Sequence, residues 1–372
     1  MSEFLPFARP EIDEETIAAV ADVLRSGWIT SGPQVQRFEA ELSAYFGGRP
    51  VRTFTHATAA LEIAVRLAGV GPGDEVIVPA MTFAASANVV QLAGGRPVFV
   101  DVDLDSRNTD AARIEAAITP RTRAIMPVHF AGLPVDMEPV YALAKRRGLR
   151  VIEDAAHAMG ASYRGRRIGA QGDLVAFSFH PNKNLTTIEG GALSFADPGE
   201  VERAERLRFH GIRKLPGGEM DVLEPASKSN MPDVSASIGL AQLKKLEQFN
   251  AKRAALARRY FSKLDGLKHL RLPAPDRPGH AWHLFAPLID FDAIGTTRRE
   301  FIEAMQARGI GVGVHYLALH LFHAYRRLGY REGDFPNAET VGARTLTLPL
   351  FTRMTEADVD RVCAALRALI LN

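Results

Sequence analysis

The feature that most constrains the fold is an alternation of short apolar runs with amphipathic stretches between residues 58 and 195. The amphipathic stretches, such as residues 59–68 and 137–147, have helical periodicity and are long enough to connect parallel strands. This alternation is typical of an α/β sheet whose strands are buried on both faces. We predict six strands, at residues 76–78, 98–100, 124–128, 151–152, 175–179 and 192–195.

The second half of the chain predicts a separate, smaller unit. Residues 211–230 mix glycines, prolines and charges without periodicity, which predicts a long loop. Helical periodicity returns from Val234 to about Leu264, and shorter helical and apolar runs follow. Because 372 residues are many for one simple core, we predict a large domain over residues 1–249 and a small α+β domain over residues 250–372.

Composition excludes several classes of function. The 45 Lys and Arg residues nearly balance the 43 Asp and Glu residues, so we expect no partner among nucleic acids or membranes. The single cysteine, Cys363, excludes a disulfide framework, and its helical surroundings predict a small core residue. The acidic N-terminal stretch lacks the pattern of a signal peptide, so we expect a soluble, cytoplasmic protein.

Two polar residues follow predicted strands. Asp154 comes as one buried strand ends, at the edge where open α/β sheets form their ligand crevice. The alternative is that Asp154 only caps the segment after it. Lys183 lies in the polar turn after a second strand. An isolated lysine there would be solvated, because burying its ammonium group is costly, so it is the combination with Asp154 that indicates a site.

A third group predicts a phosphate site. Thr58 and the residues just before it precede the helix predicted at residues 59–68, so backbone N–H groups and a hydroxyl meet at a helix N-terminus. The alternative is an ordinary threonine cap. Ser178 is placed to supply a further hydroxyl. An amine, a carboxylate and a phosphate cradle together match the needs of pyridoxal phosphate, and Phe83 is our candidate for stacking on its ring.

Beyond these residues, the chain resembles the DegT/DnrJ/EryC1/StrS family of sugar aminotransferases, which are fold type I pyridoxal-phosphate enzymes. The resemblance covers nearly the whole chain. It implies a large domain with a mostly parallel seven-stranded sheet between helices, followed by a small C-terminal α+β domain. It rests on residues 71–76, 153–157, 177–183, 189–191 and 311–316.

The resemblance implies a role for each cofactor residue. Lys183 corresponds to the lysine that bonds to the cofactor as a Schiff base, Asp154 to the partner of the pyridine nitrogen, and His157 to a residue near the ring hydroxyl. Lys183, Asp154 and His157 are therefore the expected catalytic residues. Phe83 corresponds to the residue that stacks on the ring.

The phosphate contacts implied by the resemblance involve two subunits. Ala57, Thr58 and Ser178 would hold the phosphate, and Asn230 would reach the phosphate of the partner subunit's cofactor, which implies a homodimer with shared active sites. Two departures stand out. Many relatives have Gly-Thr where this chain has Ala57-Thr58, and an aromatic-Asn-aromatic-Arg run where it has residues 229–232.

Several histidines raise the question of a metal or a substrate contact. The sequence contains no His-Glu-x-x-His or paired-cysteine pattern, so we expect no metal site. His315 and Tyr316 resemble a substrate-facing segment of the family, and the alternative is plain packing after a strand. His180 is a third candidate for substrate binding.

Within the family, the chain most resembles the transaminases that make UDP-linked 4-amino-4-deoxy-arabinose, through residues 179–180, 230–234 and 280–285. This implies ping-pong transfer between glutamate, with its product 2-oxoglutarate, and a keto sugar nucleotide such as a UDP-4-keto-pentose, in lipopolysaccharide or polysaccharide synthesis. Three alternatives stay open: an aminotransferase for a non-sugar carbonyl, a sugar dehydratase, and a non-catalytic regulator. Lys183 argues against the dehydratase, because relatives with that activity have histidine there.

Overall fold

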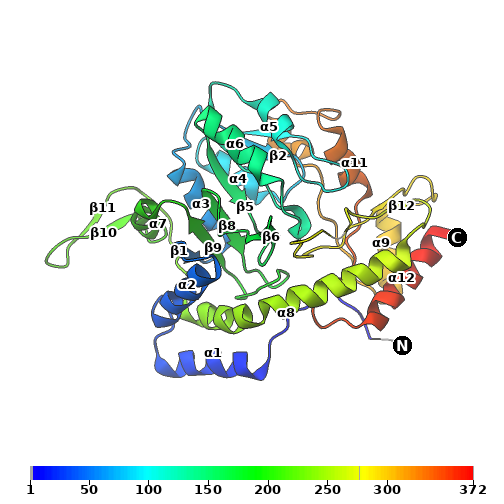
Figure 1. The fold of residues 1–372 in the computed structure, drawn as a ribbon, viewed down its shortest axis with the longest axis horizontal. Coiled ribbons are helices and arrows are strands. Elements are labelled where there is room, and N and C mark those ends of the chain that lie inside the picture. The colour runs from blue at the N-terminus through cyan, green and yellow to red at the C-terminus, as the bar shows by residue number, and fades with distance from the viewer. Residues whose placement is uncertain (1–2, 276, 372) are drawn as a thin grey trace.

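The computed structural model describes residues 3–275 and 277–371 and is built around one large sheet (Figure 1). The strands follow the order β1-β9-β8-β5-β4-β2-β3, and β9 is antiparallel to both of its neighbours while the remaining pairs are parallel. This confirms the mostly parallel seven-stranded sheet. Its strands are β1 (Val51–Phe54), β2 (Glu75–Pro79), β3 (Arg96–Val100), β4 (Thr122–Ile125), β5 (Arg150–Asp154), β8 (Leu174–Ser178) and β9 (Gly191–Phe195).

Six of these strands match the predicted runs, with two differences. The first strand, β1, lies outside the predicted set. The fourth, β4, ends at Ile125, so the prediction that it continues to Val128 was wrong. The physical reason is Pro127, which has no N–H group to donate to a neighbouring strand. Val128 forms only an isolated bridge, with Asp154.

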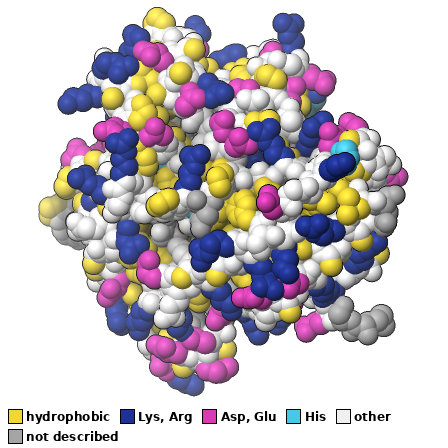
Figure 2. Space-filling view, turned by 45° about the vertical axis from the view of Figure 1, so that its right-hand side comes forward, with side chains coloured by type: hydrophobic (Ala, Val, Ile, Leu, Met, Phe, Trp, Pro, Cys, Tyr) yellow, Lys and Arg dark blue, Asp and Glu magenta, His cyan; other side chains and the backbone are white. Residues whose placement is uncertain are grey.

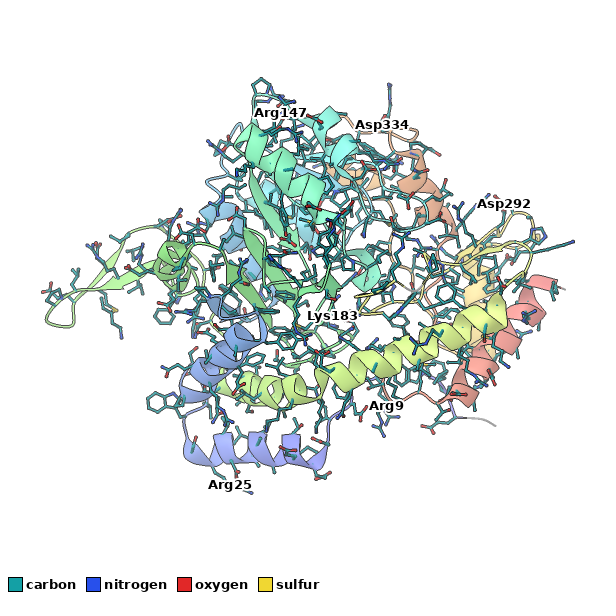
Figure 3. The ribbon with its side chains drawn as sticks, viewed as in Figure 1. Arg9, Arg25, Arg147, Lys183, Asp292 and Asp334 are labelled. Carbon is teal, nitrogen blue, oxygen red and sulfur yellow. The ribbon has the colours of Figure 1, made fainter. Side chains whose placement is uncertain are left out.

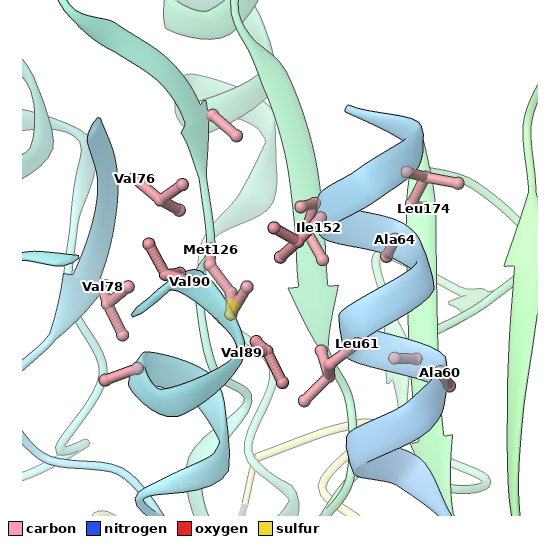
Figure 4. Close-up of a cluster of buried hydrophobic side chains, with 14 of the residues drawn as sticks. Ala60, Leu61, Ala64, Val76, Val78, Val89, Val90, Met126, Ile152 and Leu174 are labelled. Atoms are coloured by element: carbon pink, nitrogen blue, oxygen red, sulfur yellow. The ribbon is translucent and has the colours of Figure 1, made fainter. Parts of the chain in front are cut away.

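Helices cover both faces of the sheet. On one face, α3 (Ala57–Leu67) and α4 (Ala85–Leu92) pack against side chains such as Val76 and Ile152 (Figure 4). On the other face, α5 (Ala111–Ala117) and α6 (Met137–Arg147) pack against the alternate residues, such as Ile77 and Val151. Successive side chains of a strand point to opposite faces, so two-sided cover explains why apolar residues occupy consecutive positions in these strands, as at residues 76–78 and 151–152.

The N-terminal helices lie against a long helix. Figure 1 shows α1 (Glu14–Ser26) alongside α8 (Asp233–Leu264), with α2 (Pro33–Tyr45) between α8 and the sheet. The buried carboxylate of Asp233, at the first position of α8, accepts hydrogen bonds from the N–H groups of Gly32, Gln34 and Val35 at 2.8, 3.0 and 2.9 Å. These donors lie at the start of α2, so the N-terminus of α8 also caps α2.

The C-terminal unit has its own apolar core. The elements that build this core are β12 (Leu270–Arg271), β13 (Leu288–Ile289), α9 (Arg298–Ala307) and α12 (Glu356–Leu371). The intervening helix α11 (Pro336–Arg344) instead buries Ala338 and Val341 in the apolar core of the large sheet. The last turns of α8 enter the C-terminal core through Leu256, Tyr260 and Leu264, and so does Cys363, whose predicted burial is confirmed. The boundary placed at residue 250 falls inside α8, which is continuous there, and the domain limits stay a prediction.

The segment predicted to be a long irregular loop contains a hairpin, so that prediction was wrong in part. Strands β10 (Ile212–Lys214) and β11 (Met220–Val222) pair antiparallel and project from the body of the molecule (Figure 1). Their residues are mostly exposed, which explains why the sequence shows no apolar alternation. Gly217 and Gly218, at φ of 88° and 90°, make the turn that reverses the chain.

Short elements complete the described chain, and its surface carries mixed charge. Figure 2 shows Lys and Arg side chains interspersed with Asp and Glu over one face of the molecule. None of the helices in the described ranges is both long and apolar enough to cross a membrane. The short elements are β6 (Ser162–Tyr163), β7 (Arg166–Arg167), α7 (Val201–Leu207), α10 (His323–Arg326) and 3-10 turns at Phe130–Gly132, Pro198–Glu200 and Leu319–Leu321.

We expect Ile152→Ala to lower the free energy of unfolding by about 2–5 kcal/mol, because Ile152 is fully buried between the sheet and α3 and its truncation leaves a cavity. Urea denaturation followed by circular dichroism measures this. Leu92→Ala is the matched control, since Leu92 at the end of α4 is 75% exposed. Equal effects of the two substitutions would contradict this account of the core.

Candidate active site

The site forms where two neighbouring parallel strands end. Asp154 is the last residue of β5 and pairs in register with Ala176 of β8, so the two strands end at the same edge of the sheet. Ser178 ends β8, and Lys183 lies in the turn that follows. Figure 3 labels Lys183 near the centre of the molecule. Asp154, Ser178 and Lys183 line a single cavity of about 360 Å³.

This cavity gathers nearly all the residues that the sequence singled out. Asn230 is the exception: it does not line the cavity, and its side-chain amide instead donates to the hydroxyl of Ser31 at 2.5 Å. The cavity is also lined by His56, Leu61, Thr82 and Glu189, among other residues. The predicted site residues brought together here are Ala57, Thr58, Phe83, Asp154, His157, Ser178, His180, Lys183, His315 and Tyr316.

Two hydrogen bonds hold the carboxylate of Asp154. Its Oδ2 accepts from the hydroxyl of Ser86 at 2.7 Å, and its Oδ1 accepts from the N–H of Ala156 at 3.1 Å. Ser86 in turn pairs with the hydroxyl of Thr82 at 2.9 Å. Asp154 therefore does both things that the sequence left open, since it caps the following turn and also faces the cavity.

The amine of Lys183 lies among nitrogen groups. Its Nζ is 3.4 Å from Nε2 of His283, a residue that is buried and outside the cavity lining. Burial lowers the pKa of Lys183 to about 8, while the negative charge of Asp154 acts in the opposite direction. At pH 7, Lys183 is then neutral in about one molecule in ten, whereas an ordinary lysine is neutral in far fewer.

His157 and Tyr316 are hydrogen-bonded to each other on the cavity wall. Nδ1 of His157 accepts from the N–H of Ala131 at 3.2 Å, so in the neutral ring the proton is on Nε2. That nitrogen lies 3.1 Å from the hydroxyl oxygen of Tyr316 and donates to it. Burial, followed by the charge of Lys183, lowers the pKa of His157, and burial raises the pKa of Tyr316. The hydroxyl proton of Tyr316 is therefore left for a group in the cavity.

The N-terminus of α3 faces the cavity with donors to spare. The helix begins at Ala57 instead of the expected residue 59, and its cap is His56, whose Nδ1 accepts from the N–H of Ala59 at 3.0 Å. The alternative of a threonine cap was therefore wrong. Within the described ranges, the N–H groups of Ala57 and Thr58 donate no hydrogen bond. A helix N-terminus with unpaired donors is a site for an anion.

Gly191 makes this arrangement possible. A Cβ at Gly191 would lie only 2.5 Å from the backbone nitrogen of Ala57, so glycine lets β9 pass directly beneath the start of α3. The hydroxyl of Ser178 lies on the adjacent strand, because Ser178 pairs in register with Gly191. The cavity therefore offers a backbone cradle and hydroxyls at one end, together with a carboxylate and an amine.

The remaining predicted residues lie around the opening and the walls. Phe83 is 58% exposed, and its ring lies 5.8 Å from that of Tyr316. His180 is exposed and pairs with Asn182. Nδ1 of His315 pairs with the hydroxyl of Thr347 at 2.9 Å, and burial lowers its pKa to about 4 with Lys183 acting in the same direction. His315 and Tyr316 thus pack against neighbours and also line the cavity.

The donor set fits pyridoxal phosphate and gives no support to a metal ion. The amine of Lys183, the carboxylate of Asp154 and the donors at the start of α3 share one cavity, and these are the three groups that the cofactor requires. In the described part of the chain, His, Cys, Asp and Glu side chains nowhere form a group of three or more that would hold a metal ion.

The sequence reasoning missed three residues of this arrangement. Thr82 and Ser86 were detectable as hydroxyls four residues apart just after a strand, a spacing that places them on one side of the chain in a helical turn. His283 belongs to the run 280–285 that the sequence singled out, but nothing in that run shows that it meets a lysine 100 residues away.

Comparisons with known proteins agree with this geometry. The model of the DegT/DnrJ/EryC1/StrS aminotransferase family matches residues 10–367. The chain is 38% identical to DesV from S. venezuelae, solved in complex with a ketimine intermediate, over 100% of both chains with a TM-score of 0.91. It is 27% identical to PseC from Helicobacter pylori, an aminotransferase involved in the biosynthesis of pseudoaminic acid, over 100% of both chains with a TM-score of 0.93.

A third solved relative identifies the cofactor of the family. Spr1654 from Streptococcus pneumoniae, described as a sugar aminotransferase, is 34% identical, and its PLP form is matched over 99% of both chains with a TM-score of 0.92. The same protein is also known in its PMP form. Pyridoxal phosphate is thus the cofactor of these enzymes, and this chain belongs to the DegT/DnrJ/EryC1/StrS aminotransferase family.

Proposed function

We propose that this aminotransferase moves an amino group from glutamate to a keto sugar nucleotide by a ping-pong mechanism. The observation that carries the chemistry is that Asp154, Lys183 and the free donors at the start of α3 line one cavity. A sugar as acceptor is supported by the relatives, since Spr1654 is described as a sugar aminotransferase and PseC acts in pseudoaminic acid biosynthesis.

Bound pyridoxal phosphate supplies an aldehyde that exchanges amino groups and a ring that withdraws electrons. We assign Asp154 to the pyridine nitrogen, where its carboxylate, fixed by Ser86 and Ala156, would keep that nitrogen protonated. Lys183 would hold the cofactor covalently through Nζ, and the same amine, when free, would move a proton at the substrate carbon. His157 and Tyr316 would lie near the ring hydroxyl, where Tyr316 would donate its hydroxyl proton while His157 orients that hydroxyl.

The binding residues follow from the same geometry. Ala57 and Thr58, through their unpaired N–H groups, and Ser178 would hold the phosphate at the start of α3. Phe83 covers one face of the ring at the opening of the cavity. The substitution of Ala57 for the usual glycine is compatible with this role, because Ala57 lies in the first turn of an ordinary helix. His180, His315 and Tyr316 are the candidates for substrate contacts.

The nature of the acceptor rests on the sequence resemblance. Residues 179–180, 230–234 and 280–285 favour a UDP-4-keto-pentose or a related sugar, and hence a place in lipopolysaccharide or polysaccharide synthesis. Lys183 argues against a sugar dehydratase, and the complete set of Asp154, Thr58 and Lys183 argues against a non-catalytic regulator. A non-sugar carbonyl is the remaining alternative. The cytoplasmic location and the lack of a nucleic-acid or membrane partner stay predictions.

We propose a homodimer with shared active sites. Asn230 lies outside the cavity of its own chain, and its buried Oδ1 has no partner within the described ranges. Its neighbour Ser31 lies close along the chain to Trp28 and Ile29, two large apolar side chains that are 61% and 47% exposed. These observations support a dimer interface in which a second copy of the chain covers the surface around Trp28 and Ile29. Asn230 would then reach the phosphate of the partner's cofactor.

We expect the 40.6 kDa chain to behave in solution as a particle of twice that mass, since an uncovered Trp28 and Ile29 would expose apolar surface to water. Light scattering coupled to size exclusion measures the mass. Trp28→Glu should lower it toward one chain. A wild-type monomer that binds pyridoxal phosphate fully would contradict the shared site.

We expect Lys183→Ala to abolish the visible absorbance of lysine-bound pyridoxal phosphate and to lower kcat/KM by about 10³-fold or more, because both the bonding amine and the proton carrier are lost. Spectrophotometry and a coupled glutamate assay measure the two effects. Lys252→Ala, which removes an exposed lysine of α8, is the control. The full visible band in the Lys183→Ala protein would overturn the assignment.

The lowered pKa of Lys183 predicts how cofactor capture depends on pH. Only the neutral amine bonds to the aldehyde, so raising the pH increases the rate of capture by the cofactor-free protein, with its midpoint near the pKa of about 8. Stopped-flow absorbance measures the rate. Nα-acetyl-lysine in solution is the control and should have its midpoint at about 10.4. An equally high midpoint in the protein would show that burial does not act on Lys183.

The acceptor is tested in a half-reaction. Protein loaded with pyridoxamine phosphate is mixed with a UDP-4-keto-pentose, a UDP-4-keto-hexose, the corresponding free keto sugars and pyruvate. We expect the nucleotide-linked sugars to restore the absorbance of pyridoxal phosphate at least about ten times faster than the free sugars, because the nucleotide adds binding energy that orients the sugar. If pyruvate reacts and no keto sugar does, the acceptor is a non-sugar carbonyl.

A further inference from the structure

His283 contacts the essential lysine without belonging to the cavity. Its Nε2 lies 3.4 Å from Nζ of Lys183, the only side-chain partner that the described residues offer to this amine within hydrogen-bonding distance. The ring is 3% exposed and does not line the cavity. His283 therefore reaches the amine from within the protein, on a side that neither cofactor nor substrate occupies in the proposed function.

The backbone holds this histidine firmly in place. Its N–H donates to the carbonyl of Ala131 at 2.9 Å, and its carbonyl accepts from the guanidinium of Arg253 at 3.3 Å. Gly132 packs so closely that a Cβ there would lie 3.1 Å from the nitrogen of His283. A group fixed in this way is suited to holding a flexible lysine side chain at a defined point.

The two buried histidines near Lys183 differ in what fixes their protons. Nδ1 of His157 accepts from a backbone N–H, so Nε2 of that ring can only donate while the ring is neutral. Nδ1 of His283 is buried and has no hydrogen-bond partner in the described ranges. No contact therefore selects its tautomer, and Nε2 can accept from an ammonium group or donate to a neutral amine.

The charges around the ring favour its neutral form. Burial lowers the pKa of His283 well below its usual value, and Lys183, His157, Arg253 and His315 act in the same direction. All four neighbours are basic groups, and no carboxylate is among the groups that shift this pKa. A neutral imidazole has the lone pair that a protonated one lacks, so it can accept a hydrogen bond from the ammonium group of Lys183.

We propose that His283 is a positioning residue that holds the amine of Lys183 while that amine is neither bonded to the cofactor nor moving a proton at the substrate. Those stages are the cofactor-free protein and the half of the cycle in which the amino group is carried on pyridoxamine phosphate. This inference rests on the proposed function, because it assumes that Lys183 bonds to pyridoxal phosphate. It gives a role to a buried histidine that has an unpaired nitrogen beside that lysine.

Three substitutions separate the two ring nitrogens. His283→Gln places an amide near the position of Nε2 and keeps a partner for Lys183. His283→Asn places one near the position of Nδ1 and leaves Lys183 without a partner, and His283→Phe removes both polar atoms. The rate of pyridoxal phosphate capture by the cofactor-free protein measures the positioning of Lys183. The affinity for pyridoxamine phosphate, which forms no bond to the lysine, measures the cavity alone.

We expect His283→Asn and His283→Phe to capture pyridoxal phosphate about tenfold more slowly than wild type, because the amine no longer starts from a defined position. Their affinity for pyridoxamine phosphate should stay within about twofold of wild type, and His283→Gln should recover most of the capture rate. If the phenylalanine variant does not fold, the Asn and Gln pair still gives the comparison.

Other outcomes overturn the inference. Wild-type capture by the Asn variant would show that Lys183 needs no partner, and equal slowing in the Gln and Asn variants would show that Nε2 is not the atom that matters. A parallel loss of pyridoxamine phosphate affinity would show a role in cavity structure. Failure of the wild-type protein to capture pyridoxal phosphate would instead overturn the proposed function, so the two failures are distinguishable.

Discussion

The parallel pairing of β5 with β8 is the constraint on which the site depends. Asp154 and Ala176 are opposite each other in register, so the carboxylate at the end of β5 and the hydroxyl of Ser178 at the end of β8 emerge at one edge. The antiparallel strand β9 then brings Gly191 under the start of α3. A shift of one residue in the β5–β8 register would turn Asp154 to the opposite face and separate it from Lys183.

The sequence predicts the buried strands, which appear as recurring apolar runs, and the charged residues that follow those runs. The alternation of apolar runs predicts six strands, and the positions of Asp154 and Lys183 after two of them predict a site. The hairpin of β10 and β11 has no such signal, because both strands are exposed. Ser86 and His283 act through contacts that span 68 and 100 residues, so only the folded chain shows their partners.

The environment, more than the residue type, separates the roles of the histidines. Nδ1 of His157 accepts from a backbone N–H, so its Nε2 donates a hydrogen bond to Tyr316, whereas His283 has one nitrogen without a partner in the described ranges and faces an amine. His315 is paired with Thr347 and stacks on Phe7 at 5.2 Å. The roles of these histidines therefore follow from which ring nitrogen is already hydrogen-bonded, which the sequence does not show.

The unbroken course of α8 has a consequence for how the cavity can widen. The helix spans 32 residues, from the capping contact at Asp233 to the core of the C-terminal unit at Leu264, which corresponds to about 48 Å. A hinge at its centre would break several consecutive backbone hydrogen bonds, so the two units cannot swing apart there at low cost. Any motion that widens the cavity is therefore expected to involve segments other than the middle of α8.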